Sequence, residues 1–287
     1  MARLLVVGAG GALGFEIAKQ GLAEGYDVTA TYHLNGRARI AKLESLGARS
    51  SQLDLTDENQ TREHIDHCDL CIFTPILSLS SVAAPLIKEQ RAVFFSSNNV
   101  DIDGASHVYA ALREGEDRVG AHAPGSIILR PTMIYGFPGD GNISRLIGFA
   151  RRSPAMLMPG AGQSLQQPVF YRDLARIALE ALATSSNTGN IQFVAGPDRL
   201  SQQEIFETVR RVVGKRAGVI ALPLAPFRAV AALFEGVGLK APISSAQLNR
   251  LGANKCPTGK PVHFGKTTFH DGVTALARAL DDTHTDA

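Results

Sequence analysis

The sequence has few cysteines, no long apolar run and no excess of charge of either sign. Three cysteines among 287 residues, Cys68, Cys71 and Cys256, do not make the disulfide framework of a small secreted domain. No uncharged apolar stretch approaches the ~20 residues of a membrane-spanning helix. The chain enters its first expected strand at Arg3 without the apolar segment of a signal peptide. We therefore expect a cytoplasmic protein with no membrane span.

The charge balance argues against a nucleic-acid partner. Lysine and arginine number 29 against 27 for aspartate and glutamate, which gives a net charge of +2. Nucleic-acid binders concentrate positive charge, and no basic run here is longer than Arg151-Arg152 or Lys215-Arg216. The 45% of hydrophobic residues is enough for a sizeable core. A small molecule is therefore the expected partner, and a homodimer is left open.

The first half of the chain alternates short apolar runs with helical patterns. This alternation predicts right-handed crossovers and a parallel sheet covered by helices on both faces, which is an α/β doubly wound Rossmann architecture. The expected strands are 4–7, 27–31, 51–53, 70–73, 92–95 and 126–129, and the expected helices are 14–24, 37–46, 57–64, 81–89 and 109–121.

The second half is less regular and is expected to form a smaller lobe. We expect a Rossmann domain from residues 1–135, with 166–195 returning to it, and a substrate lobe from 136–165 and 196–287. Ser201 and Glu204 have the spacing of a capping box at a helix start. The other elements expected here are helices 143–151, 173–182, 227–234 and 271–280, strands 169–171 and 189–194, and a frayed end over 281–287.

A glycine-rich turn directly follows the first strand and opens the first helix. Its glycines at 8, 11 and 14 have the spacing GxxGxxG, whereas Leu13 stands where the third glycine of GxGxxG would be. Glycines here permit a sharp turn and close approach of backbone N–H groups to a pyrophosphate at the helix N-terminus. In this strand–turn–helix context we expect a dinucleotide site. The candidate cofactor contacts are Gly8, Ala9, Gly10, Gly11, Ala12, Leu13 and Gly14.

The end of the second strand bears on the choice of cofactor. An NAD site usually places an acid there for the ribose 2′-hydroxyl, whereas an NADP site places cations near the 2′-phosphate. No acid follows Asp27 in this segment, and His33 and Arg37 could meet a phosphate. The pattern favours NADP over NAD. The alternative, that both are solvated loop residues, stays open.

Several segments together resemble the extended branch of the short-chain dehydrogenase/reductase superfamily. They are the glycine turn, Leu53–Asp57, Leu129–Gly136, Gln167–Ala175 and Phe193–Ser201. The nearest branch resembled is the atypical epimerase/dehydratase-like group, which includes the NAD(P)-binding accessory subunit of respiratory complex I. The resemblance implies that Asp54 contacts adenine and that the cofactor also lies near Leu55, Thr74, Pro75 and Ser96.

The resemblance also identifies candidate catalytic residues. In catalytic members, a tyrosine moves the proton, a lysine four residues later lowers the tyrosine pKa and holds the ribose, and a serine or threonine orients the substrate oxygen. Here Tyr109 is followed by Arg113, and either Ser97 or Asn98 stands in the orienting position. Arginine keeps the charge but is larger and forked, so the ribose contacts would be rearranged. The candidate catalytic residues are therefore Tyr109, Arg113 and Ser97.

Two functions follow as competing expectations. The first is an NAD(P)-dependent epimerase/dehydratase- or reductase-like oxidoreductase acting on a hydroxylated or nucleotide-sugar-type molecule. The second is an NADP(H)-binding sensor or assembly protein without catalysis, favoured by the degenerate Tyr-x-x-x-Arg motif. The segment His64, His67, Cys68 and Cys71 has the spacing of metal ligands, but no metal is expected, because His64 lies on a helix and Cys71 is buried in the following strand, and these two directions do not converge.

Overall fold

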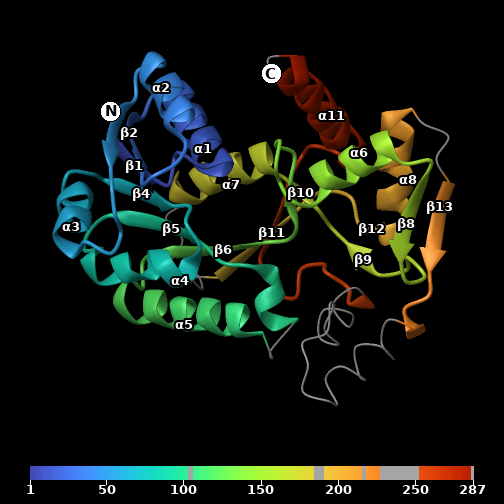
Figure 1. Ribbon diagram of the computed structural model, residues 1–287. Coiled ribbons are helices and arrows are strands. Elements are labelled where there is room, and N and C mark those ends of the chain that lie inside the picture. The colour runs from blue at the N-terminus through green and yellow to red at the C-terminus, as the bar shows by residue number, and fades with distance from the viewer. Residues whose placement is uncertain (103–105, 184–190, 215–217, 227–251, 286–287) are drawn as a thin grey trace, which may run out of the picture. The chain divides into compact units, whose positions relative to one another are not determined.

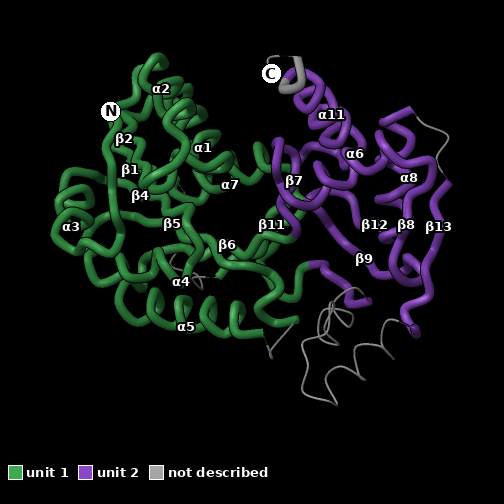
Figure 2. Tube along the Cα trace, viewed as in Figure 1, with its two compact units in different colours: residues 1–132, 169–195, 257–265 green, residues 133–168, 196–256, 266–287 purple. Residues whose placement is uncertain are grey.

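The computed structural model describes residues 1–102, 106–183, 191–214, 218–226 and 252–285. It divides into two compact units (Figure 2). Unit 1 comprises Met1–Thr132, Val169–Ala195 and Pro257–Gly265, and unit 2 comprises Met133–Pro168, Gly196–Cys256 and Lys266–Ala287. No helix within these described ranges is both long and apolar enough to cross a membrane.

Unit 1 is built on an eight-stranded sheet whose neighbouring strands are all parallel. The strand order is β14-β11-β6-β5-β4-β1-β2-β3, so the winding reverses between β1 and β4. The expected α/β doubly wound Rossmann fold is confirmed. The strands are β1 (Arg3–Val7), β2 (Asp27–Tyr32), β3 (Arg49–Gln52), β4 (Leu70–Phe73), β5 (Arg91–Phe95), β6 (Ile127–Pro131), β11 (Ile191–Ala195) and β14 (Val262–Phe264).

Helices cover both faces of this sheet (Figure 1). Helices α1 (Ala12–Ala23) and α7 (Tyr171–Ala183) pack together on one face, with α2 (Arg37–Ser45) beside α1. The other face carries α3 (Glu58–Asp66), α4 (Leu77–Ser80), the 3₁₀ helices η1 (Ser81–Leu86) and η2 (Asn98–Asp101), and α5 (His107–His122).

The expected helix over 81–89 is wrong. An α-helix ends at Ser80, and the chain continues as the short 3₁₀ helix η1, which contains Pro85. Proline has no N–H to donate, and in an α-helix its ring would clash with the carbonyl four residues earlier, here that of Ser81. The apolar residues of this segment still reach the core, because Ala83, Ala84 and Leu86 are buried.

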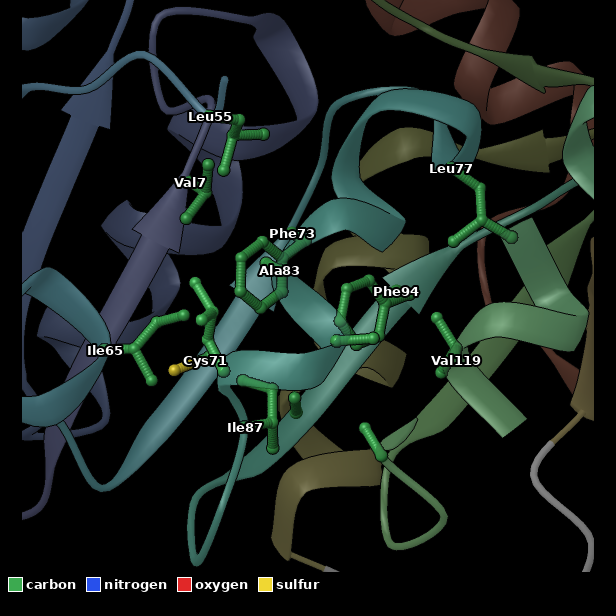
Figure 3. Close-up of a cluster of buried hydrophobic side chains, with 14 of the residues drawn as sticks. Val7, Leu55, Ile65, Cys71, Phe73, Leu77, Ala83, Ile87, Phe94 and Val119 are labelled. Atoms are coloured by element: carbon green, nitrogen blue, oxygen red, sulfur yellow. The ribbon is translucent and has the colours of Figure 1, made fainter. Parts of the chain in front are cut away.

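One hydrophobic cluster of unit 1 lies between the sheet and the helices of this second face (Figure 3). Strand β4 is buried along its whole length, as a central parallel strand requires. Phe73 of β4 and Phe94 of β5 stack with their ring centroids 4.6 Å apart. The Cys71 side chain is fully buried beside them, as expected from the sequence. This packing fixes β4 and β5, and therefore the loops that leave their carboxyl ends.

Unit 2 is smaller and mixed. Strands β8 and β13 pair in parallel and β9 and β12 pair antiparallel, while α8 packs against α6 and α11. The expected capping box is confirmed at the start of α8, where Ser201 and Glu204 cap each other. The elements are β7 (Ile134–Tyr135), α6 (Ile143–Arg152), β8 (Ala155–Pro159), β9 (Leu165–Gln166), β12 (Leu200–Ser201), α8 (Gln202–Val213), β13 (Gly218–Leu222) and α11 (Phe269–Thr285). Strand β10 (Val169–Phe170) precedes α7 in unit 1.

Three expectations for the second half need comment. The frayed end expected from residue 281 is wrong as far as Thr285, because α11 continues to that residue. The smaller lobe expected over 196–287 is interrupted, because 257–265 belongs to unit 1. There β14 pairs with β11, and the Phe193 N–H donates to the Pro261 carbonyl at 2.9 Å. The expected apolar helix 227–234 lies outside the described residues.

Candidate functional site

The glycine turn leaves the carboxyl end of β1 in a sharp bend. Gly8 has φ +85°, a left-handed conformation that favours glycine. Its carbonyl accepts from the Gly11 N–H at 3.0 Å, which closes the turn. A Cβ at Gly8 would lie 2.5 Å from Thr74 Oγ1 and 3.1 Å from Pro75 Cδ. The two residues after β4 therefore pack directly on the turn.

Two other glycines of the turn allow close backbone approach. A Cβ at Gly14 would collide with the Gly8 carbonyl oxygen and lie 2.9 Å from the Ala9 Cα. A Cβ at Gly10 would collide with the Asn35 carbonyl oxygen. The Ala9 N–H donates to the Thr31 carbonyl at 2.7 Å, which ties the turn to β2. The glycine spacing thus lets helix α1 begin close against the strands.

The N-terminus of α1 is open to an anion. Its N-cap residue is Gly11, which supplies no side-chain cap, and its first turn contains no acidic residue. The first N–H groups of a helix have no intrahelical acceptor, and the helix dipole places partial positive charge there. Gly11 is exposed, and Ala12 and Leu13 are half-buried. This cradle fits the diphosphate of a dinucleotide.

The basic residues after β2 lie in different surroundings. His33 is exposed and its Nε2 lies 3.6 Å from Asp54 Oδ2. Arg37 is the exposed first residue of α2. Arg39, which the sequence reasoning did not select, donates from Nη1 to the Gly10 carbonyl at 3.0 Å. Arg39 is therefore held against the glycine turn. The sequence Arg37-Ala-Arg39 was the feature from which this second cation could have been selected.

Asp54 and Leu55 follow β3. The Asp54 carboxylate accepts from the Thr56 N–H at 2.9 Å and from the Thr56 hydroxyl at 2.7 Å. These bonds lower the pKa of Asp54, and His33 adds a smaller effect in the same direction. The Leu55 side chain is buried in the core, so only its main chain is available to a cofactor.

The candidate catalytic residues lie beyond the carboxyl end of β5. Tyr109 and Arg113 occupy successive turns of α5. Ser97 caps η2, because its Oγ accepts from the Asn99 N–H at 3.2 Å. The Asn99 side-chain amide donates to the Tyr109 hydroxyl at 3.0 Å. Asn99 therefore links Ser97 to Tyr109, a contact that the sequence reasoning missed.

Asn98 and Arg113 both have protein partners. Asn98 is 1% exposed, and its Oδ1 accepts from the Thr258 N–H at 3.2 Å. Between the two residues considered for the orienting role, Ser97 is the more accessible. Arg113 donates from Nη2 to the Val100 carbonyl at 2.7 Å. One of the five N–H groups of this guanidinium is therefore used within the protein.

A buried ion pair lies behind these residues. Arg130 of β6 contacts Glu116 of α5 through two bonds, Nε to Oε1 at 2.8 Å and Nη2 to Oε2 at 2.5 Å. The bond from Glu116 raises the pKa of Arg130, although burial opposes this. Arg130 Nη1 also contacts Asp101 at 2.6 Å, and the Ser96 hydroxyl donates to Glu116. The network joins the ends of β5 and β6 to the helix that carries Tyr109.

The His/Cys segment before and within β4 forms hydrogen bonds instead of a converging ligand set. His64 bonds the Gln60 carbonyl through Nδ1 at 2.7 Å and Ser51 Oγ through Nε2 at 2.9 Å. His67 Nδ1 bonds the Glu63 carbonyl at 2.6 Å. Within the described part of the chain, no three His, Cys, Asp or Glu side chains are grouped so that they could hold a metal ion.

Two comparisons place this sequence among known proteins. Residues 4–84 match the model of the NAD dependent epimerase/dehydratase family. Over 134 residues, 46% of this chain, the sequence is 30% identical to a ceramide reductase of Caulobacter vibrioides. An equally long match is 28% identical to the mitochondrial NADH-ubiquinone oxidoreductase 40 kDa subunit of Neurospora crassa. These matches cover only 41% and 34% of the two relatives.

Solved structures extend the likeness to the whole fold. The UDP-glucuronic acid 4-epimerase of Bacillus cereus in complex with NAD has a TM-score of 0.73 and 18% identity over 99% of this chain and 98% of that one. The dTDP-glucose 4,6-dehydratase of Bacillus anthracis in complex with NAD has a TM-score of 0.74 and 12% identity, with the same coverage. At such identities the likeness shows the fold alone. Residues 4–84 therefore match the NAD dependent epimerase/dehydratase family model, and the chain shares its fold with solved epimerases and dehydratases.

Proposed function

We propose that this protein is an NADP(H)-dependent oxidoreductase of the epimerase or reductase type that acts on a hydroxylated small molecule. One observation carries the proposal. The glycine turn follows β1 and the Ser97–Asn99–Tyr109 group follows β5, within one parallel sheet. Carboxyl ends of parallel strands meet at one edge of a sheet, so a cofactor-binding turn and a proton-transfer group share that edge.

The cofactor would be held by residues on several strand ends. The glycine turn would bind the diphosphate, Asp54 and the Leu55 main chain would border the adenine, and Thr74, Pro75 and Ser96 would border the path toward the nicotinamide. We favour NADP over NAD, because β2 ends in Tyr32 without an acid and Arg37 and Arg39 follow it. A bound nicotinamide would supply or accept a hydride.

The protein's own groups would move the proton. Tyr109 would give a proton to, or take one from, the substrate oxygen, and Ser97 would orient that oxygen by a hydrogen bond. Asn99 would donate to the Tyr109 oxygen and so favour its charged form. Arg113 would supply positive charge one helical turn away, in the position where catalytic relatives have lysine.

A second candidate function is a protein that binds NADP(H) without catalysis. The observation in its favour is that Arg113 donates to the Val100 carbonyl. A guanidinium held by the protein is less available for the ribose contact. Such a protein would sense bound cofactor or stabilise an assembly. A purified sample that binds NADPH but turns over no substrate would support this candidate.

Turnover on a panel of nucleotide sugars and other hydroxylated or carbonyl compounds tests the first candidate. We expect cofactor-dependent turnover that falls at least a hundredfold in Tyr109→Phe while NADPH affinity is unchanged. Tyr26→Phe is the matched control, because Tyr26 is a half-buried tyrosine of the same unit away from this group. Full activity of Tyr109→Phe on a true substrate would refute the role assigned to Tyr109.

Charge reversal on α2 tests the cofactor preference. Arg37→Glu is expected to weaken NADP binding at least tenfold and to leave NAD binding nearly unchanged, because only NADP carries the 2′-phosphate. Lys42→Glu, an exposed change further along the same helix, is the control. Equal effects of Arg37→Glu on both cofactors would contradict the preference. The cytoplasmic location and the homodimer also remain proposals, and light scattering of the purified chain tests the latter.

A further inference from the structure

Unit 2 contains a cavity of about 770 Å³. Its walls come from α6, β8 and α8, together with the segment around Lys255, and all of its lining residues belong to unit 2. The volume lies within the usual range for small-molecule sites. None of the candidate cofactor-binding or catalytic residues named above lines it.

The wall is largely apolar. Leu146 and Phe149 contribute from α6, Leu157 from β8, and Ile205 and Phe206 from α8. Phe149 and Leu157 remain 42% and 49% exposed. Single exposed apolar side chains are ordinary, but two large ones on the wall of one cavity offer a continuous surface that an apolar ligand would cover.

The charged side chains of the wall are both cations, Arg145 and Lys255. Arg145 is exposed and has no ion pair or hydrogen bond with any other described residue. The nearest acid along the chain, Asp140, accepts from the N–H groups of Asn142 at 3.0 Å and Ser144 at 2.8 Å. The Asp140 carboxylate therefore faces the start of α6, and none of the described residues that line the cavity is acidic.

We propose that this cavity binds an amphipathic anion, a hydrocarbon chain that carries one acidic group. The chain would cover Phe149, Leu157 and Ile205, and the anion would pair with Arg145 and Lys255. The claim that this anion is also the substrate rests on the proposed function. Under that function, the substrate is an aliphatic acid that carries a hydroxyl or carbonyl group. A nucleotide sugar fits less well, because the hydrogen-bonding side chains among the described lining residues, apart from the two cations, are the amides of Asn142, Gln166 and Gln202, and the rest of the wall is apolar.

Calorimetry on the full chain tests the binding. The probes are octanoate and decanoate below their critical micelle concentrations, decanol, and UDP. We expect one saturable site for decanoate, roughly tenfold tighter than for octanoate because two methylenes are added. We also expect decanoate to bind more tightly than decanol, and UDP more weakly than decanoate.

Two variants separate the cavity from adventitious binding. Arg145→Gln is expected to weaken decanoate roughly tenfold and leave decanol unchanged. Leu157→Asp is expected to abolish the gain from octanoate to decanoate. Arg211→Gln, an exposed arginine of α8 outside the wall, is the matched control and should change nothing. Melting curves verify that each variant is folded. Decanoate binding that neither cavity variant alters would overturn the proposal, as would tighter binding of UDP.

NADPH titrations of the same samples distinguish this inference from the proposed function. If NADPH binds and decanoate does not, the cavity assignment fails and the proposed function stands. If decanoate binds as described and NADPH does not, the proposed oxidoreductase fails, and with it the claim that the anion is a substrate. Binding of both, with turnover of a hydroxy or oxo fatty acid, is the outcome that the inference predicts.

Discussion

Asn99 donates its side-chain amide to the hydroxyl oxygen of Tyr109 at 3.0 Å. Its backbone N–H meanwhile donates to Ser97 Oγ, so one residue connects the candidate proton donor with the candidate orienting hydroxyl. This amide is a neutral donor already in place at the tyrosine oxygen, and under the proposed function Asn99 acts as a positioning residue for Tyr109.

The Asn99–Tyr109 contact leads to a kinetic prediction. Asn99→Ala removes the donor, and we expect kcat to fall about tenfold or more while KM changes little, because the bond strengthens as the tyrosine oxygen gains charge. Asn99→Asp, which places an acceptor beside the same oxygen, should lower kcat further. Steady-state kinetics with a substrate found in the panel described under Proposed function measure both. An Asn99→Ala enzyme with the kcat of the wild type would contradict the assignment.

The Glu116–Arg130 pair leads to a prediction about stability. Both side chains are nearly buried, 5% and 9% exposed, so Glu116→Gln leaves a buried guanidinium without its main ionic partner. We expect the free energy of unfolding to fall by about 3–5 kcal/mol, toward the lower end because Asp101 still contacts Arg130. Asp101 is 43% exposed, and the matched change Asp101→Asn should cost up to about 1 kcal/mol. Urea unfolding at a common m-value compares the two variants. Equal losses of unfolding free energy in Glu116→Gln and Asp101→Asn would contradict the difference expected between the buried and the exposed acid.

Cys68 leads to a prediction about pH. Burial raises the pKa of its thiol to about 11, against about 8.5 for an unfolded cysteine. Below pH ~8.5 both states hold the proton and this contribution to stability is complete, whereas between about 8.5 and 11 only the folded state holds it, so stability falls as pH rises. Urea midpoints should decline less over this window in Cys68→Ala. Mass spectrometry should also find Cys68 alkylated at pH 8 far more slowly in native than in denatured protein, and equal rates would count against a buried thiol.

The hydrophobic pattern of the sequence was sufficient to predict the strand β4 at the centre of the sheet. The run Leu70–Phe73 predicted β4 with the bounds observed, because a strand buried on both faces is apolar throughout and is bounded by polar residues. Strand β14 had no such signal, since Val262–Phe264 is half-buried to exposed at the edge of the sheet. Its place depends on pairing with β11 across some 70 residues of chain, which local pattern does not encode.

The glycine turn of the candidate site could be predicted from the sequence, whereas the hydrogen bonds that join the site residues to other elements could not. The turn at Gly8–Gly14 follows from local geometry, because a strand, a bend and a helix succeed one another within a few residues. The contacts of Arg39 with Gly10 and of Asn99 with Tyr109 join separate elements. The geometry of these contacts depends on how η2, α5 and α2 pack. Sequence spacing therefore indicated that these segments lie near the site but did not predict the hydrogen bonds.

Calorimetric titration of NADPH into the wild type and Gly11→Asp tests the central claim most directly. An aspartate at this N-cap should leave the melting temperature nearly unchanged, because the cap it adds to α1 offsets a Cβ that would lie 3.3 Å from the Gly8 carbonyl oxygen, yet its charge should repel a diphosphate at the same N–H groups. We predict saturable binding to the wild type, at least tenfold weaker binding to Gly11→Asp, and an intermediate affinity for the uncharged cap Gly11→Asn. Equal NADPH affinity in the wild type and a folded Gly11→Asp protein, or no binding to the wild type, would contradict the account.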